Sequence, residues 1–534
     1  MSSRRSLVLA SALGVLGFSA CGGDEASGPA SFVPADSPLY IEARVQPTDE
    51  QRSALEELAG RFTELPIVGE VADPFDLLEQ ELDRAASDAG VDFSFSEDVE
   101  PWLGEWGAMA ASAEALAQSE GDEADQGFVF ALEVSDADAA RDALTRFGEG
   151  GEDLEVAEFA GVEGIAGDDL YAAVVDEALI AAPTEEDFQA ALDANDGDSL
   201  GDSDGFDEAF GELDAGEAIA RAYVDFGAVM EATAEAEGEF EDLEIVRGLI
   251  PELDGPIGAA LFVRDHGVTL DVSAPGEAAG SAEALRAVSA DAVAAIGIAD
   301  LGARLRDGVA RIERIGAELG EFSEGQLASA FQGLTGVSLD DAAAALGDGV
   351  LELQGQLSDA FAVQLRVDAD DGGTVESLLN GLQNFLEADE STRVGPPLAG
   401  DAGFSAQPRG DAGEGSPIKF IGAETDGETV TATVASDIDE ARAAMEADGE
   451  ALADDPGFQA AAEALGDGFE PSAFARPGAL LESVLGGASA LDIVTGGSLE
   501  DAIPGFLAGK LSWLAAGMRG EGERVVTRIV VGVE

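Results

Sequence analysis

The sequence predicts an α+β protein of two homologous tandem modules, each a largely antiparallel sheet packed with amphipathic helices. Three observations predict this class. Short stretches that alternate apolar and polar residues recur along the chain, and amphipathic stretches with acidic or hydroxyl caps lie between them. Patterns of the first half return in the same order in the second half. With 534 residues, 46% of them hydrophobic, the chain can fill at least two cores.

The first half shows the elements most clearly. Residues 39–45 alternate as a strand, Asp49 is placed to cap a helix over residues 50–62, and a second helix is expected after Asp73. The further elements expected here are a strand over 105–111, an acidic insert over 112–126, a strand over 128–134, a helix over 136–147, a hairpin of 170–175 with 178–182, and a helix over 184–192. Asp225 and Asp300 each follow a strand and are expected to cap the next helix.

The second half repeats this order. Residues 128–134 (Phe-Val-Phe-Ala-Leu-Glu-Val) correspond to residues 361–367 (Phe-Ala-Val-Gln-Leu-Arg-Val). Each half closes with a hairpin, one turning at Asp265, His266 and Gly267 and the other at residues 521–522. A duplication explains this pattern. The expected domains are a signal peptide at 1–20, a flexible tether at 21–37, a first module at 38–275, a linker at 276–291 and a second module at 292–534. Residues 395–416 are expected to form a long loop.

The N-terminus predicts the location. Arg4 and Arg5 precede an uncharged apolar run at residues 7–18, which is shorter than the roughly 20 residues that a transmembrane helix needs. Small residues then lead to Cys21, and residues 16–21 resemble a lipobox. The resemblance implies cleavage after Ala20, a lipid on Cys21, and an extracytoplasmic protein held on the cell membrane. The arginine pair leaves open general secretory or twin-arginine export.

Charge and cysteine content exclude several classes. The chain has 110 Asp and Glu against 26 Lys and Arg, a net charge of −84. With no basic patch to release counterions, nucleic-acid binding is excluded, and the acidity suggests salt adaptation. Because Cys21 is the single cysteine, neither an intramolecular disulfide nor a cysteine-ligated metal site is possible.

No catalytic motif is found. His266 is the single histidine and lies in an expected hairpin turn, which excludes histidine-based triads and typical zinc sites. Trp102 and Trp106 are interpreted as packing residues rather than a sugar-binding platform. No catalytic residues and no cofactor are therefore predicted. A carboxylate-dependent envelope hydrolase stays an alternative, because it needs only two facing acids and the chain has many.

The densest acidic stretch offers candidate calcium ligands in Asp193, Asn195, Asp196 and Asp198. The glycine that follows Asp196 falls fifth from Asp193, whereas an EF-hand loop places it sixth. A solvated linker, with Asp204 capping the next helix, is therefore preferred. A low-affinity calcium-binding surface protein stays an alternative.

A family resemblance adds to this. The lipobox, the stretch from Phe32 to Tyr40 (Phe-Val-Pro-Ala-Asp-Ser-Pro-Leu-Tyr) and the Ala-, Leu- and Asp-rich repeats resemble an uncharacterised family of secreted and lipid-anchored bacterial proteins, mostly actinobacterial, known only as a domain of unknown function. The resemblance implies an envelope location and no activity. The expected function is noncatalytic ligand binding or scaffolding, with a hydrophobic ligand or an envelope protein as partner, of unknown identity.

Overall fold

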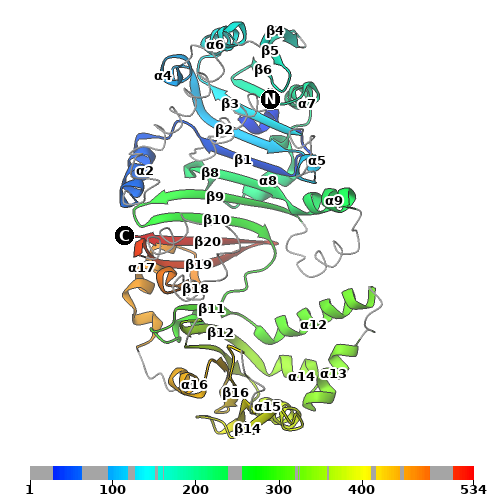
Figure 1. Cartoon of the computed structure of the whole chain (residues 1–534), viewed down its shortest axis with the longest axis vertical. Coiled ribbons are helices and arrows are strands. Elements are labelled where there is room, and N and C mark those ends of the chain that lie inside the picture. Colours follow the sequence, from blue (N-terminus) through cyan, green and yellow to red (C-terminus); the bar gives the residue numbers. More distant parts are fainter. Residues whose placement is uncertain are drawn as a thin grey trace. The chain divides into compact units, whose positions relative to one another are not determined.

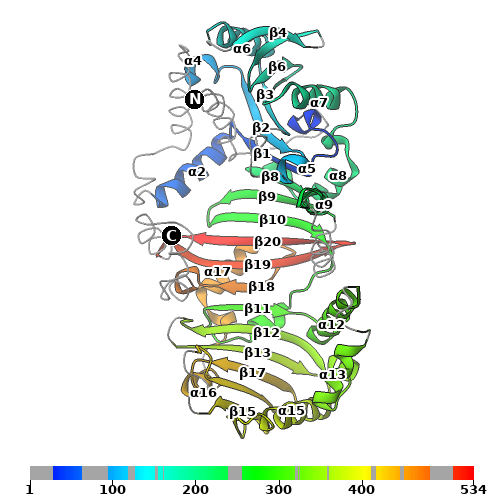
Figure 2. The same ribbon diagram turned by 45° about the vertical axis from the view of Figure 1, so that its right-hand side comes forward.

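The computed structural model describes residues 28–62, 94–117, 127–150, 154–159, 161–237, 255–318, 323, 325–357, 360–409, 416–445, 450–480 and 509–534. The chain divides into two compact units (Figures 1 and 2). Unit 1 comprises residues up to Gly276 and Glu521–Val526, and unit 2 comprises Glu277–Gly520 and Thr527–Glu534. Both combine helices with antiparallel strands, which confirms the predicted α+β class.

The sheet of unit 1 is a continuous series of antiparallel neighbours. Its strands are β1 (Leu39–Arg44), β2 (Leu103–Ala111), β3 (Phe128–Val134), β4 (Leu154–Phe159), β5 (Val162–Gly167), β6 (Tyr171–Val175), β7 (Ala178–Ala182), β8 (Ala220–Asp225), β9 (Pro256–Arg264) and β10 (Gly267–Pro275). Their order is β4-β5-β6-β7-β3-β2-β1-β8-β9-β10. The expected hairpins of β6 with β7 and of β9 with β10 are confirmed.

Helices pack on this sheet through small and aromatic side chains. They are η1 (Pro29–Phe32), α2 (Asp49–Arg61), α4 (Phe95–Asp98), α5 (Ala113–Ala117), α6 (Ala137–Gly150), α7 (Glu185–Asp196), η2 (Leu200–Asp202), α8 (Asp204–Phe210), η3 (Ala215–Glu217) and α9 (Phe226–Glu237). Figure 1 shows α6 beside β4, β5 and β6. In one core cluster, Phe188 of α7 packs with Ile180 of β7, and both are fully buried. Burial of such side chains contributes roughly 1.5–3 kcal/mol each.

Unit 2 has its own antiparallel series. Its strands are β11 (Ala294–Ile298), β12 (Leu346–Gly355), β13 (Phe361–Ala369), β14 (Thr392–Gly395), β15 (Ala402–Pro408), β16 (Phe420–Thr425), β17 (Thr429–Ala435), β18 (Glu470–Ala475), β19 (Leu511–Glu521) and β20 (Arg524–Val533). Their order is β14-β15-β16-β17-β13-β12-β11-β18-β19-β20. The strand order of unit 1 therefore recurs in unit 2, where β11 to β20 take the places of β1 to β10.

The helices of unit 2 pack on both faces of its sheet. They are α11 (Ala282–Arg286), α12 (Leu301–Glu318), α13 (Gln326–Thr335), α14 (Leu339–Ala344), α15 (Gly372–Glu387), α16 (Ile438–Met445), η6 (Leu452–Asp454) and α17 (Pro456–Leu465). Val375 and Leu379 of α15 pack with Phe404. Ala441 of α16 packs instead with Phe420 and other residues of the opposite sheet face. Figure 2 shows β12, β13 and β17 side by side in this sheet.

The last strand contributes to both units. Residues 524–526 belong to unit 1, and the rest of β20 belongs to unit 2. Within unit 1, Arg524 is 9% exposed. Its guanidinium donates to the Ser273 hydroxyl at 3.0 Å and to the Pro256 carbonyl at 2.8 Å. The C-terminal segment is thus bonded into unit 1.

The C-terminal half of the tether expected at residues 21–37 is packed, so that expectation is wrong for this part. Pro29 begins the short helix η1, and Phe32 and Val33 are 4% and 1% exposed. Phe32 belongs to the core cluster of β7 and α7. Phe32 and Val33 are apolar residues within a Gly-, Ser- and Pro-rich stretch, and their burial holds this stretch against unit 1. Similarly, the expected linker at 276–291 contains α11, whose Leu285 is fully buried.

Two helix caps differ from the expectation by one residue. Thr48, not Asp49, caps α2, because its hydroxyl accepts the Gln51 N–H while the Gln51 side chain accepts the Thr48 N–H. Ser203, not Asp204, caps α8 by accepting the Phe206 N–H. Hydroxyl and carboxylate caps are of similar strength, about 1 kcal/mol, so adjacent candidates cannot be ranked by residue type alone.

The expected long loop at residues 395–416 is also wrong in part, because β15 lies within it. Phe404 and Ala406 are 4% and 3% exposed and point to the core. Their period-two spacing was masked by the surrounding Gly, Ala and Pro residues. The hairpin of β4 with β5 was not predicted at all. The expected helix after Asp73 lies outside the described residues.

Candidate ligand-binding site

A polar cavity of about 320 Å³ lies in unit 2 on the sheet face that α16 covers. The residues lining it are Gln364, Arg366, Ala399, Gly400, Glu424, Thr425, Asp426, Thr429, Thr431 and Met445. We call it the Glu424 cavity. Its volume falls within the range of small-molecule sites.

Strand pairing brings the polar side chains to one face. Arg366 of β13 is the register partner of Thr431 of β17, and Thr431 is the partner of Glu424 of β16. Register partners share a face of the sheet, so these three form a row across neighbouring strands. Gln364, two residues before Arg366, lies in the next row on the same face.

Glu424 is the most constrained acid of the cavity, at 6% exposure. Its Oε2 accepts the N–H groups of Leu398 and Ala399 at 2.9 and 3.0 Å. In the described part of the chain no hydrogen bond or ion pair reaches its Oε1. Gly400 lets the loop backbone come this close, since a Cβ there would lie 2.9 Å from Glu424 Cβ. The loop thus fixes the carboxylate and leaves one oxygen for the cavity.

Asp426 stands at the same end of the cavity. Its Oδ1 accepts the N–H groups of Glu428 and Thr429 at 3.0 and 2.8 Å. These bonds hold the carboxylate at the β16–β17 turn, and they lower the pKa of Asp426 because they favour its ionised form. Two acids therefore share this end.

Arg366 supplies the positive charge of the cavity. Its Nη2 lies 3.4 Å from Glu352 Oε1, and its Nη1 donates to the Ala287 carbonyl at 3.3 Å. Burial raises the pKa of Glu352, and the nearby guanidinium of Arg366 opposes that shift. The Gln364 amide, oriented to satisfy both of its ends, donates to Glu352 Oε1 at 2.6 Å and accepts the Met445 N–H at 3.2 Å.

Unit 1 holds a second buried charge cluster. Glu42 is 1% exposed and forms an ion pair with Arg221. The Tyr40 hydroxyl donates to Glu42 Oε2 at 2.5 Å. The Arg221 guanidinium lies 4.7 Å from the ring centre of Trp106. Burial raises the pKa of Glu42, while Arg221 opposes that shift.

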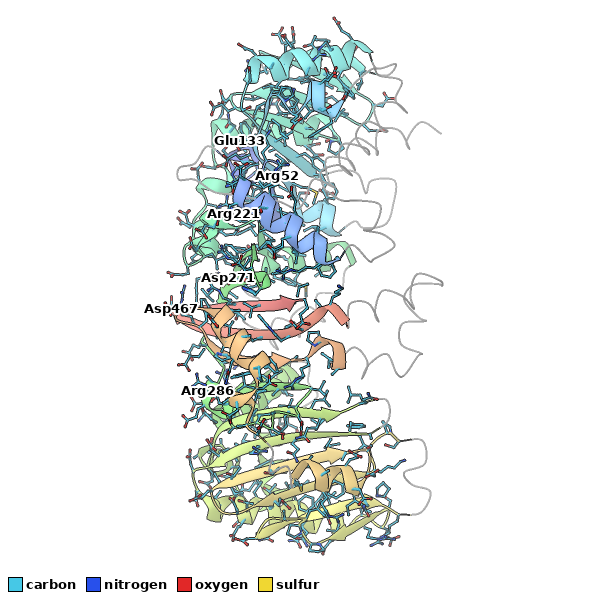
Figure 3. All side chains as sticks on the ribbon, turned by 90° about the vertical axis from the view of Figure 1, so that its left-hand side faces the viewer. Arg52, Glu133, Arg221, Asp271, Arg286 and Asp467 are labelled. Carbon is cyan, nitrogen blue, oxygen red and sulfur yellow. The ribbon has the colours of Figure 1, made fainter. Side chains whose placement is uncertain are left out.

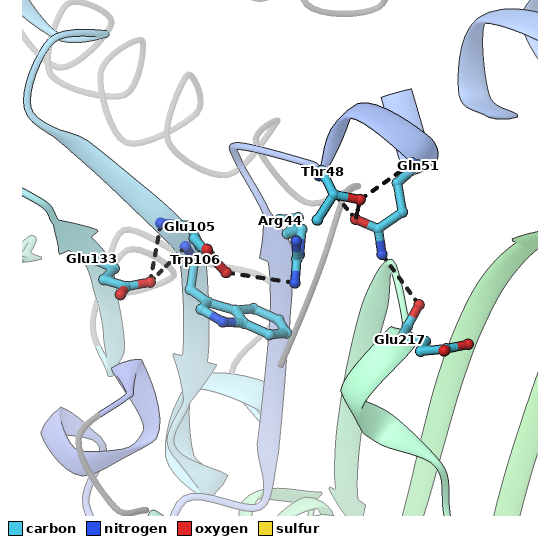
Figure 4. Close-up of polar contacts among 7 residues, drawn as sticks. All are labelled: Arg44, Thr48, Gln51, Glu105, Trp106, Glu133 and Glu217. Atoms are coloured by element: carbon cyan, nitrogen blue, oxygen red, sulfur yellow. Dashed lines mark hydrogen bonds and ion pairs between the residues drawn. The ribbon is translucent and has the colours of Figure 1, made fainter. Parts of the chain in front are cut away.

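Close by, the β2 strand is stabilised at its bulge (Figure 4). Glu133 Oε2 accepts the N–H groups of Glu105 and Trp106 at 3.1 and 3.0 Å, and Arg44 pairs with Glu105 at 3.5 Å. The register of β2 with β3 shifts at this point. Glu133 and Arg221, both labelled in Figure 3, belong to unit 1. Every group of these clusters holds the fold together, so we do not assign a ligand to them.

The candidate calcium ligands do not form an open loop. Asp193, Asn195 and Asp196 belong to the last turn of α7, and Asp198 follows it. Gln189 donates to Asp193, and Asn195 donates to Asp176. Within the described ranges, no three acidic, histidine or cysteine side chains converge as a metal site.

The other residues that the sequence analysis singled out lie in turns, in the core or at helix starts, apart from Cys21. His266 lies in the β9–β10 turn, 3.1 Å from the Thr269 hydroxyl. Trp102 and Trp106 are 5% and 7% exposed, so both are buried, as the packing interpretation expected. Asp225 caps α9 through the Ala228 N–H, whereas the Asp300 N–H donates to Asp348. Cys21 lies outside the described residues.

Sequence reasoning missed Glu424 and Arg366. The available signal was the alternation Gln364-Leu365-Arg366, which places two polar side chains on one face of a strand that is otherwise apolar. The partner acid lies about 60 residues later, and only the strand order brings it near.

The fold and the cavity define an α+β protein with antiparallel sheets and a polar site of small-molecule size. Of the helices in the described ranges, none is long and apolar enough to cross a membrane. The chain belongs to DUF3352, a family of proteins of unknown function, whose profile matches residues 6–468. The expected membership of a family of unknown function is thereby confirmed in its general form.

Similarity to other known proteins is distant. No curated protein matches. The solved structure titled "Structure of crystal form I of TP0453" is similar at 9% identity and a TM-score of 0.24, covering 47% of this chain and 79% of that chain. Crystal form IV gives 11% identity and the same TM-score, with 47% and 81% covered. Similarity at this level does not establish a shared fold.

Proposed function

We propose that this protein is a lipid-anchored, extracytoplasmic, noncatalytic binding protein that takes a small polar molecule in the Glu424 cavity. The observation that carries the proposal is Glu424 itself. A carboxylate that is 6% exposed is expensive to bury unless its acceptor positions are filled. The loop fills one oxygen of Glu424, and a ligand would fill the other.

The polar lining favours this ligand over the hydrophobic ligand expected from the sequence. The groups that face the cavity are a guanidinium, an amide, carboxylates and threonine hydroxyls. Its described lining holds no serine, histidine, cysteine or lysine, so a nucleophile or base there would have to be a threonine or one of the two carboxylates. The hydrolase alternative would need an acid in the cavity to act on a bound substrate.

The anchor rests on the sequence. The charged start, the short apolar run and Cys21 support export and lipid attachment, and the net charge supports salt adaptation. In the native host, replacement of Cys21 by alanine should move the protein from the membrane fraction and remove the mass of the lipid. Retention in the membrane with unchanged mass would contradict the anchor.

Native mass spectrometry tests the cavity. Protein purified from its own membranes should carry an added mass beyond the covalent lipid. Glu424→Gln should lower the fraction that carries it, whereas Glu428→Gln, an equal charge change at an exposed site of the same hairpin, should not. No added mass in any sample, with no added solute bound on titration, would contradict the proposal.

We also propose that the two units are homologous modules produced by duplication. The recurrence of a ten-strand order with the same connections supports this more strongly than the short sequence matches. An experimental structure whose units fail to superpose strand for strand would contradict it.

Contact with an envelope protein is the second candidate. Ile296 and Leu351 are register partners on neighbouring strands and are 50% and 38% exposed. Adjacent exposed apolar residues on one sheet face are typical of protein contacts. Crosslinking from a photoreactive residue at Leu351 in intact cells, with Leu357 as exposed control, tests this candidate.

A further inference from the structure

The two ends of the Glu424 cavity carry opposite charge. Glu424 and Asp426 line it from β16 and the turn that follows, and Arg366 lines it from β13, two strands away. Arg366 and Glu424 lie two strands apart in one register row, with Thr431 between them. At about 4.8 Å for each strand step, their Cα atoms are about 10 Å apart. One small molecule can therefore contact both ends.

The acidic end has unfilled acceptors. The loop N–H groups bind one oxygen of Glu424, and the turn N–H groups bind one oxygen of Asp426. Among the described residues, neither acid forms an ion pair with an arginine or lysine. Two carboxylates with free oxygens suit an ammonium group, which donates three hydrogen bonds and carries the opposite charge.

The basic end has unfilled donors. A guanidinium has five N–H donors, and Arg366 uses one on the Ala287 carbonyl and one in a long contact with Glu352. The Arg366 side chain is 33% exposed, so its other donors are accessible from the cavity. The planar guanidinium is suited to a carboxylate, which it can bind through two parallel hydrogen bonds.

Glu352 keeps Arg366 in place without filling the cavity. Glu352 is fully buried, and its Oε1 lies 3.4 Å from the Arg366 guanidinium. The Gln364 amide donates to the same oxygen. The middle of the cavity then offers the Thr431 hydroxyl and no aromatic surface. A ligand that spans the site therefore meets charged groups at both ends and a hydroxyl between them.

We propose that the ligand of the Glu424 cavity is a small zwitterion, with its ammonium on Glu424 and Asp426 and its carboxylate on Arg366. This inference rests on the proposed function and names the ligand class. An amino acid with separated charges or a short peptide has this chemistry. A simple amine would leave Arg366 without an anionic partner. A simple acid would be repelled by the carboxylates of Glu424 and Asp426.

Calorimetric titration tests the class. The probes are γ-aminobutyrate, 5-aminopentanoate, 6-aminohexanoate and glycylglycine, with butylamine and butyrate as the single-charge analogues. The sample is the mature chain carrying Cys21→Ser, so that no lipid is needed for purification. At least one zwitterion should bind ten or more times more tightly than butylamine and than butyrate.

Variants assign the two ends. Glu424→Gln and Arg366→Gln should each weaken the zwitterion at least tenfold, whereas Glu428→Gln and Arg393→Gln, which change exposed residues of the same unit, should not. Because Arg366→Gln also removes the partner of Glu352, Arg366→Lys is tested beside it. Arg366→Lys keeps the charge and should recover part of the affinity if the protein folds.

The outcomes separate this inference from the proposed function. Butylamine binding as tightly as the zwitterions would overturn the role of Arg366 and the zwitterion. An added mass on the native protein, with no probe bound, would also overturn the zwitterion and leave the proposed function standing. If the native protein carries no added mass and no probe binds, both the zwitterion and the proposed function are overturned.

Discussion

Removal of Arg221 should destabilise unit 1 far more than removal of an exposed arginine. Its partner Glu42 is 1% exposed and forms no other ion pair in the described residues. Breaking a buried pair by deleting one partner costs about 3–5 kcal/mol, because the remaining charge is buried and uncompensated. Arg221→Leu should therefore lower the free energy of unfolding of unit 1 by about 3–5 kcal/mol.

Arg264 is the matched control. Its guanidinium also lies on an aromatic ring, 4.9 Å from the centre of Phe262, but its partner Glu217 is 66% exposed. Exposed pairs contribute about 0–1 kcal/mol, so Arg264→Leu should have a small effect. Arg221→Leu also removes a contact 5.5 Å from the centre of Phe210, so the difference between the two substitutions measures the buried charge together with one extra ring contact.

Urea unfolding followed by tryptophan fluorescence is the assay. Trp102 and Trp106 lie in unit 1 and Trp513 in unit 2, so a Trp513→Phe background makes the signal report on unit 1. Adding Glu42→Gln to Arg221→Leu should recover part of the loss, because no lone charge then remains buried. Equal losses for Arg221→Leu and Arg264→Leu would refute the reasoning.

Three further predictions follow from single contacts. Glu133→Ala leaves two N–H groups of the β2 bulge without an acceptor and should lower the stability of unit 1 by about 1–3 kcal/mol, whereas Glu133→Gln should keep most of it, in the same urea assay. Burial raises the pKa of Glu352, so its contribution to stability is fully present below the unfolded pKa and is lost as pH rises through the folded pKa. The stability of Glu352→Gln relative to the native chain should therefore improve as pH rises. Hydrogen-exchange protection of residues 346–355 whose difference between the two chains does not change with pH would contradict this. Gly381→Ala should lower the melting temperature in calorimetry, because its Cβ would lie 2.1 Å from a carbonyl oxygen of α13, whereas Gly333→Ala, in open space on α13, should raise stability by about 1 kcal/mol; the opposite order would contradict the packing.

Local patterns predicted the elements that form through near neighbours. The alternation of residues 128–134 predicted β3 with its observed bounds, since a strand with one buried face shows period two directly. The turn at Asp265 and His266 predicted the β9–β10 hairpin. The caps of α2, α8 and α9 were located to within one residue, because Ser, Thr and Asp are nearly equal in that position.

Long-range pairing was beyond a single sequence. The Glu424 cavity depends on β13 lying beside β17 rather than beside β14, and nothing in the composition of Gln364 or Arg366 specifies that neighbour. Phe404 and Ala406 form a strand only because β14 and β16 pair with it on both sides. Such strands depend on tertiary context more than on propensity.

The position of Arg524 has a consequence for the order in which the chain matures. A polypeptide is synthesised from its N-terminus, so most of unit 1 emerges first. Yet residues 521–526 belong to unit 1, and Arg524 donates to Ser273 and Pro256 from the end of the chain. Unit 1 therefore cannot be completed until nearly all 534 residues have been made, and a chain cut short anywhere in unit 2 leaves the first unit unfinished as well.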